Sequence, residues 1–292
     1  MRWTRGGRSR NVEDRRGQRT GRPMSGAGLQ VLFMLARTKL GLVAIVLFFA
    51  FFWFSGGDIS QLLGGQPMSS GTGSAVSDPG EEELMQFVSF VLDDNQELWT
   101  KLFPQMGQNY REATLVVFRD VTRTACGYGQ AATGPFYCPP DQSVYIDLGF
   151  YDELRRRFGA PGDFAQAYVI AHEIGHHVQN LTGIEREVRR RQSAGPGDAN
   201  ALSVRMELQA DCLAGVWGHD AAGRRLLEPG DLEEGLNAAA AIGDDRIQQG
   251  SGQTVNPDAF THGSSAQRIE WFRRGFDSGD PAACDTFGGT GG

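Results

Sequence analysis

Residues 171–177 read Ala-His-Glu-Ile-Gly-His-His and contain the pattern H-E-x-x-H. On a helix, His172 and His176 lie one turn apart, so both imidazoles project from one face and can reach the same metal ion. Glu173 lies about 100° around the helix axis from His172, beside the metal rather than on it. A glutamate there can act as the general base for a water that the metal activates. The pattern therefore predicts a zinc site able to hydrolyse an amide, although so short a pattern also occurs by chance.

The residues around this pattern favour a helix. A breaker cluster, Gly-Ala-Pro-Gly, occupies 159–162, and Asp163 can cap a helix with Gln166 three residues further on. Apolar residues then recur at helical spacing up to Gly183, which supplies a stop. Within the helix, Gly175 costs about 1 kcal/mol relative to alanine. Its presence predicts either a close neighbour packed against that face or a role in the metal site.

A third metal ligand is expected from another segment, because catalytic zinc usually has three protein ligands. The best candidate is Glu207, which shares a face with Asp211 in the helix-like run 200–212. We expect Glu207 to coordinate the metal and Asp211 to accept a hydrogen bond from the far N–H of a ligand histidine. The alternative is that both acids, with Arg205, form the solvated side of an amphipathic helix.

The other histidines fit the site less well. His177 lies about 140° from His172 on the same helix, so we expect it to be packed or hydrogen-bonded instead. His219 follows the interruption at Gly218 and is left out. His262 precedes a helix-like stretch at 267–276, where it could stabilise the oxyanion formed on water attack. A cap or loop histidine is the alternative for His262.

Several segments beyond the motif carry a resemblance to a known family. They are 134–139, 144–147, 162–171, 207–212, 242–245 and 261–268. Through them the chain resembles the bacterial putative neutral zinc metallopeptidase family, membrane-anchored proteins of the zincin type, over roughly 114–287. The resemblance implies zinc held by His172, His176 and Glu207, with Glu173 as base, and nominates 143–147 as an edge strand that receives substrate backbone. It implies little about the substrate.

The N-terminal part of the chain has the composition of a membrane anchor. Residues 1–39 contain ten basic and two acidic side chains, and an unbroken apolar run follows at 40–54. That run is slightly short of the roughly 20 residues that a spanning helix needs, but its flanks extend it to 39–57. We expect a basic cytoplasmic segment at 1–38 and a single transmembrane helix at 39–57, with the remainder on the extracytoplasmic side of the cell membrane. A cleaved signal peptide and an arginine-rich nucleic-acid arm are the less favoured alternatives.

Beyond the anchor, a Gly/Ser-rich linker is expected at 58–80 and one domain at 81–292. Removing the ten basic and two acidic residues from the totals of 28 and 35 leaves 18 basic and 33 acidic residues, a net charge of about −15. Such a domain is not expected to bind nucleic acid or anionic lipid.

The four cysteines suit an oxidising compartment. Cys126 and Cys138 bracket a glycine-rich loop and form a reasonable disulfide, which would leave Cys212 to pair with Cys284. Free buried thiols are the alternative if the domain faces the cytoplasm. Cys212 is not expected to bind zinc, because it lies about 140° from Glu207 on the same helix.

Strand-like segments come early and helix-like segments late, which predicts an α+β fold: a zincin-like domain with a small sheet and an active-site helix. Strands are expected at 114–120 and 143–148. Besides the two site helices, we expect helices at 81–103, 229–243 and 264–276. The arginine-rich stretch at 183–198 is expected to be an exposed, solvated loop, and a flap near the site is the alternative.

These features predict a membrane-anchored zinc-dependent peptidase that uses a zinc-activated water and Glu173 as general base. Zinc, with His262 or Tyr145, would hold the oxyanion, and a peptide or protein would be the substrate. Two alternatives stay open: a non-catalytic membrane-tethered module that binds peptides around a structural zinc, and a hydrolase of cell-wall amides. The intact Glu173 favours catalysis.

Overall fold

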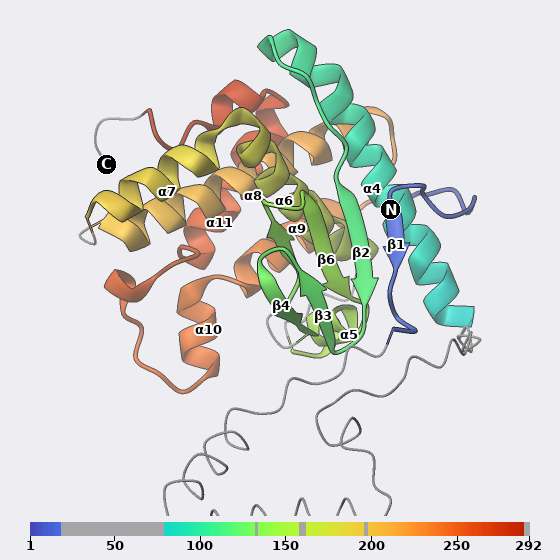
Figure 1. Ribbon diagram of the computed structural model, residues 1–292, viewed down its shortest axis with the longest axis horizontal. Coiled ribbons are helices and arrows are strands. Elements are labelled where there is room, and N and C mark those ends of the chain that lie inside the picture. The colour runs from blue at the N-terminus through green and yellow to red at the C-terminus, as the bar shows by residue number, and fades with distance from the viewer. Residues whose placement is uncertain (19–78, 132–133, 158–161, 196–197, 289–292) are drawn as a thin grey trace, which may run out of the picture. The chain divides into compact units, whose positions relative to one another are not determined.

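Helix α6 (Asp163–Thr182) lies at the centre of the protein, seen here in a computed structural model that describes residues 1–18, 79–131, 134–157, 162–195 and 198–288. It packs against α4 (Pro79–Leu102), α8 (Ala199–Gly223) and α9 (Asp231–Ala241) (Figure 1). The helix predicted around the histidine pattern is confirmed. Its N-cap is the extended Gly162, with Asp163 in the first turn, and it ends at Gly183, whose φ of 82° is left-handed.

The remaining helices are α5 (Gly149–Arg157), α7 (Ile184–Ala194), α10 (Asp244–Gly250) and α11 (Ser265–Ser278). Short 3₁₀ turns also occur: η1 (Phe103–Met106), η4 (Pro257–Ala259) and η5 (Pro281–Cys284). The loop predicted at 183–198 is wrong, because most of this stretch is helix α7. The arginines there pair one turn back along the helix, Arg189 with Glu185 and Arg191 with Glu187, while Val188 is buried.

The main sheet has the order β1-β2-β6-β5. Strands β1 (Val12–Asp14), β2 (Thr114–Phe118) and β6 (Ser143–Asp147) are parallel, and β5 (Phe136–Cys138) is antiparallel to β6. A separate hairpin joins β3 (Val121–Thr124) to β4 (Gly127–Gln130). The edge strand predicted at 143–147 is therefore wrong. Strand β6 is paired on both sides, and the edges of this sheet are β1 and the three-residue β5.

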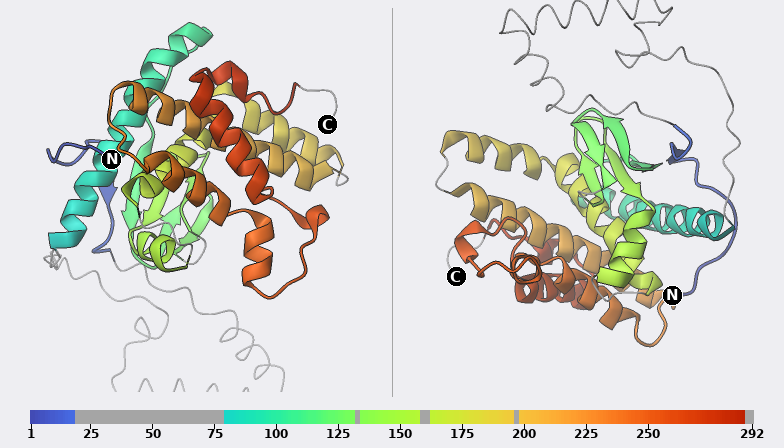
Figure 2. Two further views of the ribbon diagram at one scale, coloured as in Figure 1. Left: turned by 180° about the vertical axis from the view of Figure 1, so that it is seen from behind. Right: turned by 90° about the horizontal axis from the view of Figure 1, so that it is seen from below.

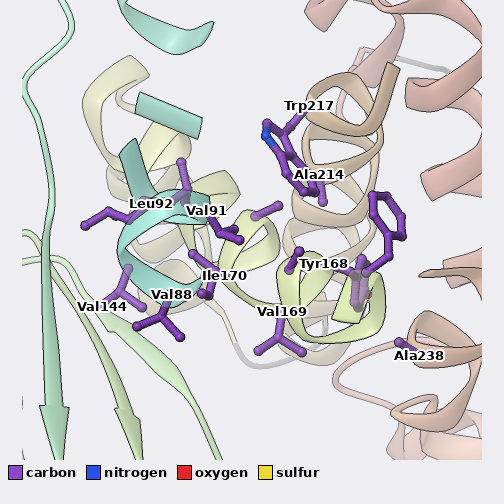
Figure 3. Packing of buried hydrophobic residues seen from close by; sticks show 14 of the residues in the cluster. Val88, Val91, Leu92, Val144, Tyr168, Val169, Ile170, Ala214, Trp217 and Ala238 are labelled. Carbon is purple, nitrogen blue, oxygen red and sulfur yellow. The ribbon is translucent and has the colours of Figure 1, made fainter. Parts of the chain in front are cut away.

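The core joins the sheet to the central helix through α4. Figure 3 shows Val88, Val91 and Leu92 of α4 near Ile170 of α6 and Val144 of β6, and all five are at most 1 % exposed. Each such buried side chain contributes about 1.5–3 kcal/mol. This packing fixes the position of α6 relative to the sheet, and the mixed α+β class predicted from the sequence is confirmed.

Glycines let three of the helices approach closely. A Cβ on Gly175 of α6 would lie 2.9 Å from the carbonyl oxygen of Ala210 in α8. Of the two explanations offered for Gly175, the close neighbour is the one observed, and it brings the two site helices together. Helices α8 and α11 lie side by side (Figure 2), and a Cβ on Gly275 of α11 would lie only 1.8 Å from the carbonyl oxygen of Cys212. The backbones themselves are in contact at this crossing.

Replacing Gly275 by alanine is expected to lower the free energy of unfolding by about 3 kcal/mol, because the new methyl group would push α11 away from α8. Urea unfolding of the oxidised protein measures the change. Gly223→Ala, at the end of α8 where a Cβ meets nothing within 4 Å, is the matched control and should change stability by about 1 kcal/mol or less. Equal effects of the two substitutions would contradict the close crossing.

Both predicted disulfides are confirmed, Cys126–Cys138 and Cys212–Cys284. The second ties α8 to the C-terminal η5 next to the crossing with α11.

The first residues of the chain belong to the same compact unit as the later part. Met1–Arg16 groups with Val76–Gly292 (Figure 1), and the cytoplasmic placement expected for 1–38 stays a prediction. Within the described residues, no helix combines the length and apolar character needed to span a bilayer. The span predicted at 39–57, and all but the last two residues of the linker predicted at 58–80, lie outside the described residues.

Candidate metal centre

Helices α6 and α8 bring three potential metal ligands together. His172 Nε2 lies 3.1 Å from Glu207 Oε2, and His176 Nε2 lies 3.5 Å from Glu207 Oε1. One ligand atom from each of the three residues lies within 4.8 Å of the others. Two imidazole nitrogens and one carboxylate oxygen make the donor set of a common class of catalytic zinc site. The residues present therefore fit a zinc ion.

A buried network orients the His172 imidazole. Its Nδ1 lies 2.9 Å from Asp211 Oδ1, so the N–H is donated to the carboxylate and Nε2 is left free to bind metal. Arg268 donates to both oxygens of Asp211, at 2.8 and 2.9 Å, and the Tyr168 hydroxyl donates to it as well. Burial alone would raise the pKa of Asp211, but Arg268 and His172 outweigh it and hold that pKa below its usual value. Asp211 therefore stays ionised.

A different residue orients His176. The Nδ1 of His176 lies 2.8 Å from Gln179 Oε1, which accepts its hydrogen and again leaves Nε2 free. The Gln179 amide donates to the Met206 carbonyl at 2.7 Å and to Gln209 Oε1 at 3.0 Å, which fixes which end of the amide faces the histidine. Each candidate ligand histidine thus has its own acceptor.

Replacing Gln179 by alanine is expected to weaken zinc affinity about 10- to 100-fold, because the His176 ring loses the acceptor that sets its tautomer. Competition against a chromogenic zinc chelator measures the change. Gln166→Ala, at a half-buried position near the start of the same helix, is the matched control and should leave the affinity unchanged. Unchanged affinity in both variants would contradict the role of Gln179.

Glu173 lies beside these residues with no partner of its own. It is 7 % exposed and faces the cleft, and among the described residues none hydrogen-bonds to its carboxylate. Burial raises the pKa of Glu173, and the nearby His176 and His172 only partly oppose this. A buried carboxylate with free oxygens and a raised pKa can take up a proton from a water in the cleft.

The cleft in front of the site has a volume of about 1370 Å³. Its walls come from the 134–139 segment with β5, from α5, α6, α7 and α8, and from α10 with the loop before α11. His262 lines this cleft and is half-exposed, with Nδ1 3.1 Å from Asp244 Oδ1. The other oxygen of Asp244 accepts the backbone N–H groups of residues 261–263 at 2.6–3.1 Å. Asp244 therefore holds His262 on the cleft wall. That His262 stabilises an oxyanion stays a prediction.

Tyr145, the other residue considered for the oxyanion, is not among the cleft-lining residues. Its hydroxyl donates to Asp141 at 2.8 Å, and its ring stacks on Phe136 with centroids 5.0 Å apart. As an interior position of β6, Tyr145 is 2 % exposed. The proposed role of Tyr145 was wrong because the strand order buries it behind β5.

The remaining histidines lie outside the ligand set. His177 is fully buried, with Nε2 2.6 Å from the Arg111 carbonyl and Nδ1 2.9 Å from the Tyr137 hydroxyl. Burial lowers the pKa of His177 to about 4, so it is neutral, and it joins α6 to β5. The packed, hydrogen-bonded role predicted for His177 is confirmed. His219 lies 2.7 Å from the carbonyl of Phe276 and is absent from the cleft lining.

A second group of acids, Asp163, Asp231 and Glu234, also comes close enough to surround a cation. The amino group of Met1 forms ion pairs with Asp163 and with Asp231, the latter at 3.3 Å. A cation from the chain itself is therefore already paired with two of these three acids.

Three comparisons relate the chain to known proteins. A family model described as putative neutral zinc metallopeptidase matches residues 1–287. The chain is 52 % identical over 289 residues to the uncharacterized protein YpfJ of Escherichia coli (strain K12), covering 99 % of each chain. It is 44 % identical over 201 residues to the uncharacterized protein Rv2575 of Mycobacterium tuberculosis, covering 65 % of this chain and 66 % of that protein. No solved structure matches the chain.

Proposed function

Because the chain belongs to the putative neutral zinc metallopeptidase family, we propose that it is a zinc-dependent peptidase with Glu173 as its general base. The observation that carries this proposal is the meeting of His172, His176 and Glu207 from two helices, with the unpaired Glu173 beside them in the cleft. The two histidines and Glu207 would hold the zinc. When bound, zinc would lower the pKa of water and polarise the scissile carbonyl.

The chain's own residues would carry the protons. Glu173 would accept a proton from the attacking water and pass it to the leaving amine. The His262 imidazole, held through Nδ1 by Asp244, would face the negative charge that develops on the carbonyl oxygen. Asp211 and Gln179 would keep the ligand histidines in one tautomer throughout.

The cleft is suited to an extended peptide. At about 1370 Å³ it exceeds the 300–1,000 Å³ typical of small-molecule pockets. Strand β5 lines it as an edge strand of the sheet, so an extended chain could pair with its free backbone groups. Such pairing makes few demands on sequence, which supports a peptide or protein substrate over a small cell-wall amide.

We place the domain on the extracytoplasmic side of the cell membrane, with the apolar run at 39–57 as the part of the chain that contacts the bilayer. Two disulfides support an oxidising compartment, since such bonds are rare in the cytoplasm. The attachment rests on the composition of that run alone.

The proposal is tested by incubating the full chain, oxidised and loaded with zinc, with a diverse peptide library and identifying new termini by mass spectrometry. We expect cleavage that a zinc chelator abolishes and added zinc restores. Zinc binding without any cleavage would favour the peptide-binding module, or the cell-wall amide hydrolase if cell-wall fragments are cut instead. Cleavage that persists in the chelator would contradict a zinc peptidase.

A further inference from the structure

We infer that Met1–Arg16 is docked on the proposed catalytic domain and lies in the same compartment. The chain between them therefore crosses the membrane either not at all or an even number of times. The arginines of this segment predicted a cytoplasmic N-terminus, with the domain on the opposite side. The structure gives the same arginines partners on the domain itself. This inference concerns topology and does not depend on the peptidase activity.

The backbone of the segment is part of the main sheet. Strand β1 pairs with β2 in a parallel register that runs from Val12 opposite Leu115 to Asp14 opposite Val117. Hydrogen bonds continue the pairing on both sides, from Leu115 N to the Asn11 carbonyl at 2.8 Å and from Arg15 N to the Val117 carbonyl at 2.7 Å. A strand held by such hydrogen bonds must lie on the same side of a bilayer as its sheet, because backbone groups less than 3 Å apart cannot be separated by a hydrocarbon core about 30 Å thick.

The arginine side chains match acids at the start of α4 and just before β2. Four of them form ion pairs with glutamates of the domain: Arg5 with Glu83, Arg8 with Glu82, Arg10 with Glu112 and Arg16 with Glu81. The side chain of Arg16 is only 7 % exposed and also bonds to Asp14. Exposed pairs contribute little individually, but the complementarity explains these arginines without a topological role.

Apolar contacts fix the segment as well. The Trp3 ring lies 5.4 Å from that of Phe87 and 6.5 Å from that of Phe90, both on α4. The buried Ser9 donates to Asp93 of the same helix at 2.5 Å. The Arg15 guanidinium lies over the ring of Tyr145 at 5.9 Å, on the sheet behind the cleft wall. The segment therefore packs along α4 and reaches the sheet that carries β5.

The family comparison includes this segment. The family model begins at residue 1, and the E. coli relative covers 99 % of the chain. Met1–Arg16 is therefore shared by the family and is not an addition peculiar to this chain. A single crossing at the apolar run 40–54 would separate β1 from β2 and leave these contacts unmade.

The test is cysteine labelling of the full chain in bacterial spheroplasts with a membrane-impermeant maleimide. Thr4→Cys reports on the N-terminal segment and Asp277→Cys on the domain, and both positions are exposed. The native cysteines are all in disulfides, so the new thiol is the one available for labelling. We expect the two variants to be labelled from the same side. Labelling of one in intact spheroplasts and of the other only after lysis would overturn the inference.

If both thiols react only after lysis, the shared compartment stands and the extracytoplasmic placement fails. Hydrogen exchange on the full chain gives a second, independent measurement. The amide of Arg15, which donates to the Val117 carbonyl, should exchange far more slowly than the amide of an unstructured peptide. Exchange at the rate of an unstructured peptide would overturn the docking of β1, whatever the labelling shows.

Discussion

Replacing Glu173 by glutamine is expected to lower kcat/KM for peptide hydrolysis about 100- to 10,000-fold while zinc stays bound. The amide has nearly the shape of the carboxylate but cannot take up a proton, so water attack loses its base. Because Glu173 is not among the three grouped ligands, the metal should keep all of its protein donors. Initial cleavage rates and zinc per chain, measured on the same preparation, check both parts of this prediction.

The matched control for this variant is Glu97→Gln. Glu97 is an exposed residue of α4 that pairs with Lys101, and it is absent from the cleft lining. Its amide variant should cleave peptides as fast as the unmodified chain. Turnover within a few-fold of normal in Glu173→Gln would remove Glu173 from the mechanism, even if zinc is present.

Replacing Glu207 by alanine is expected to weaken zinc affinity by more than about 100-fold. This loss is larger than the one expected for Gln179→Ala, because Gln179 only orients a ligand histidine. The variant removes the single carboxylate among the three donors, which contacts both histidines. Peptide cleavage should be lost at zinc concentrations that saturate the unmodified chain, and excess zinc should restore part of it. Competition with a chromogenic chelator measures the affinity.

Glu270→Ala provides the comparison, because Glu270 is an exposed α11 residue paired with Arg274. Its zinc affinity should equal that of the unmodified chain. If Glu207→Ala also binds zinc normally, the third ligand is another residue. That result would favour the alternative in which Glu207 belongs to the solvated face of an amphipathic helix.

The local sequence was enough to predict the central helix α6 and the presence of a close neighbour, which is α8. The spacing of His172 and His176 defines one helix face, and the cost of Gly175 inside the helix pointed to a close neighbour, which is Ala210 of α8. Glu207 and Asp211 are four residues apart, which predicted that both acids lie on one face of α8. These features follow from helix periodicity, which a sequence carries directly.

Other parts of the site depend on contacts between distant segments. Arg268 meets Asp211 across 57 residues, and a buried arginine has no local signal that separates it from a surface one. Gln179 could have been found, since it lies three residues after His176 on the same face. Strand β5 has only three residues, too few to show an alternating pattern, and the family resemblance alone nominated 143–147 as the edge strand.

The N-terminal segment shows that composition alone does not identify the partners of its arginines. Arginines before an apolar run satisfy the rule for membrane orientation. The same arginines complement acids on α4 that come 65 or more residues later, and only the folded arrangement reveals the pairing. In α7, likewise, charge density suggested a loop, although the spacing of its acids and arginines suits a helix.

The most direct test of the proposed metal centre is to locate zinc in crystals of the full chain by anomalous scattering at the zinc absorption edge. We expect one peak, about 2.0–2.2 Å from Nε2 of His172, Nε2 of His176 and a carboxylate oxygen of Glu207. A peak at any other group of residues, or no peak from crystals grown with zinc, would contradict the account.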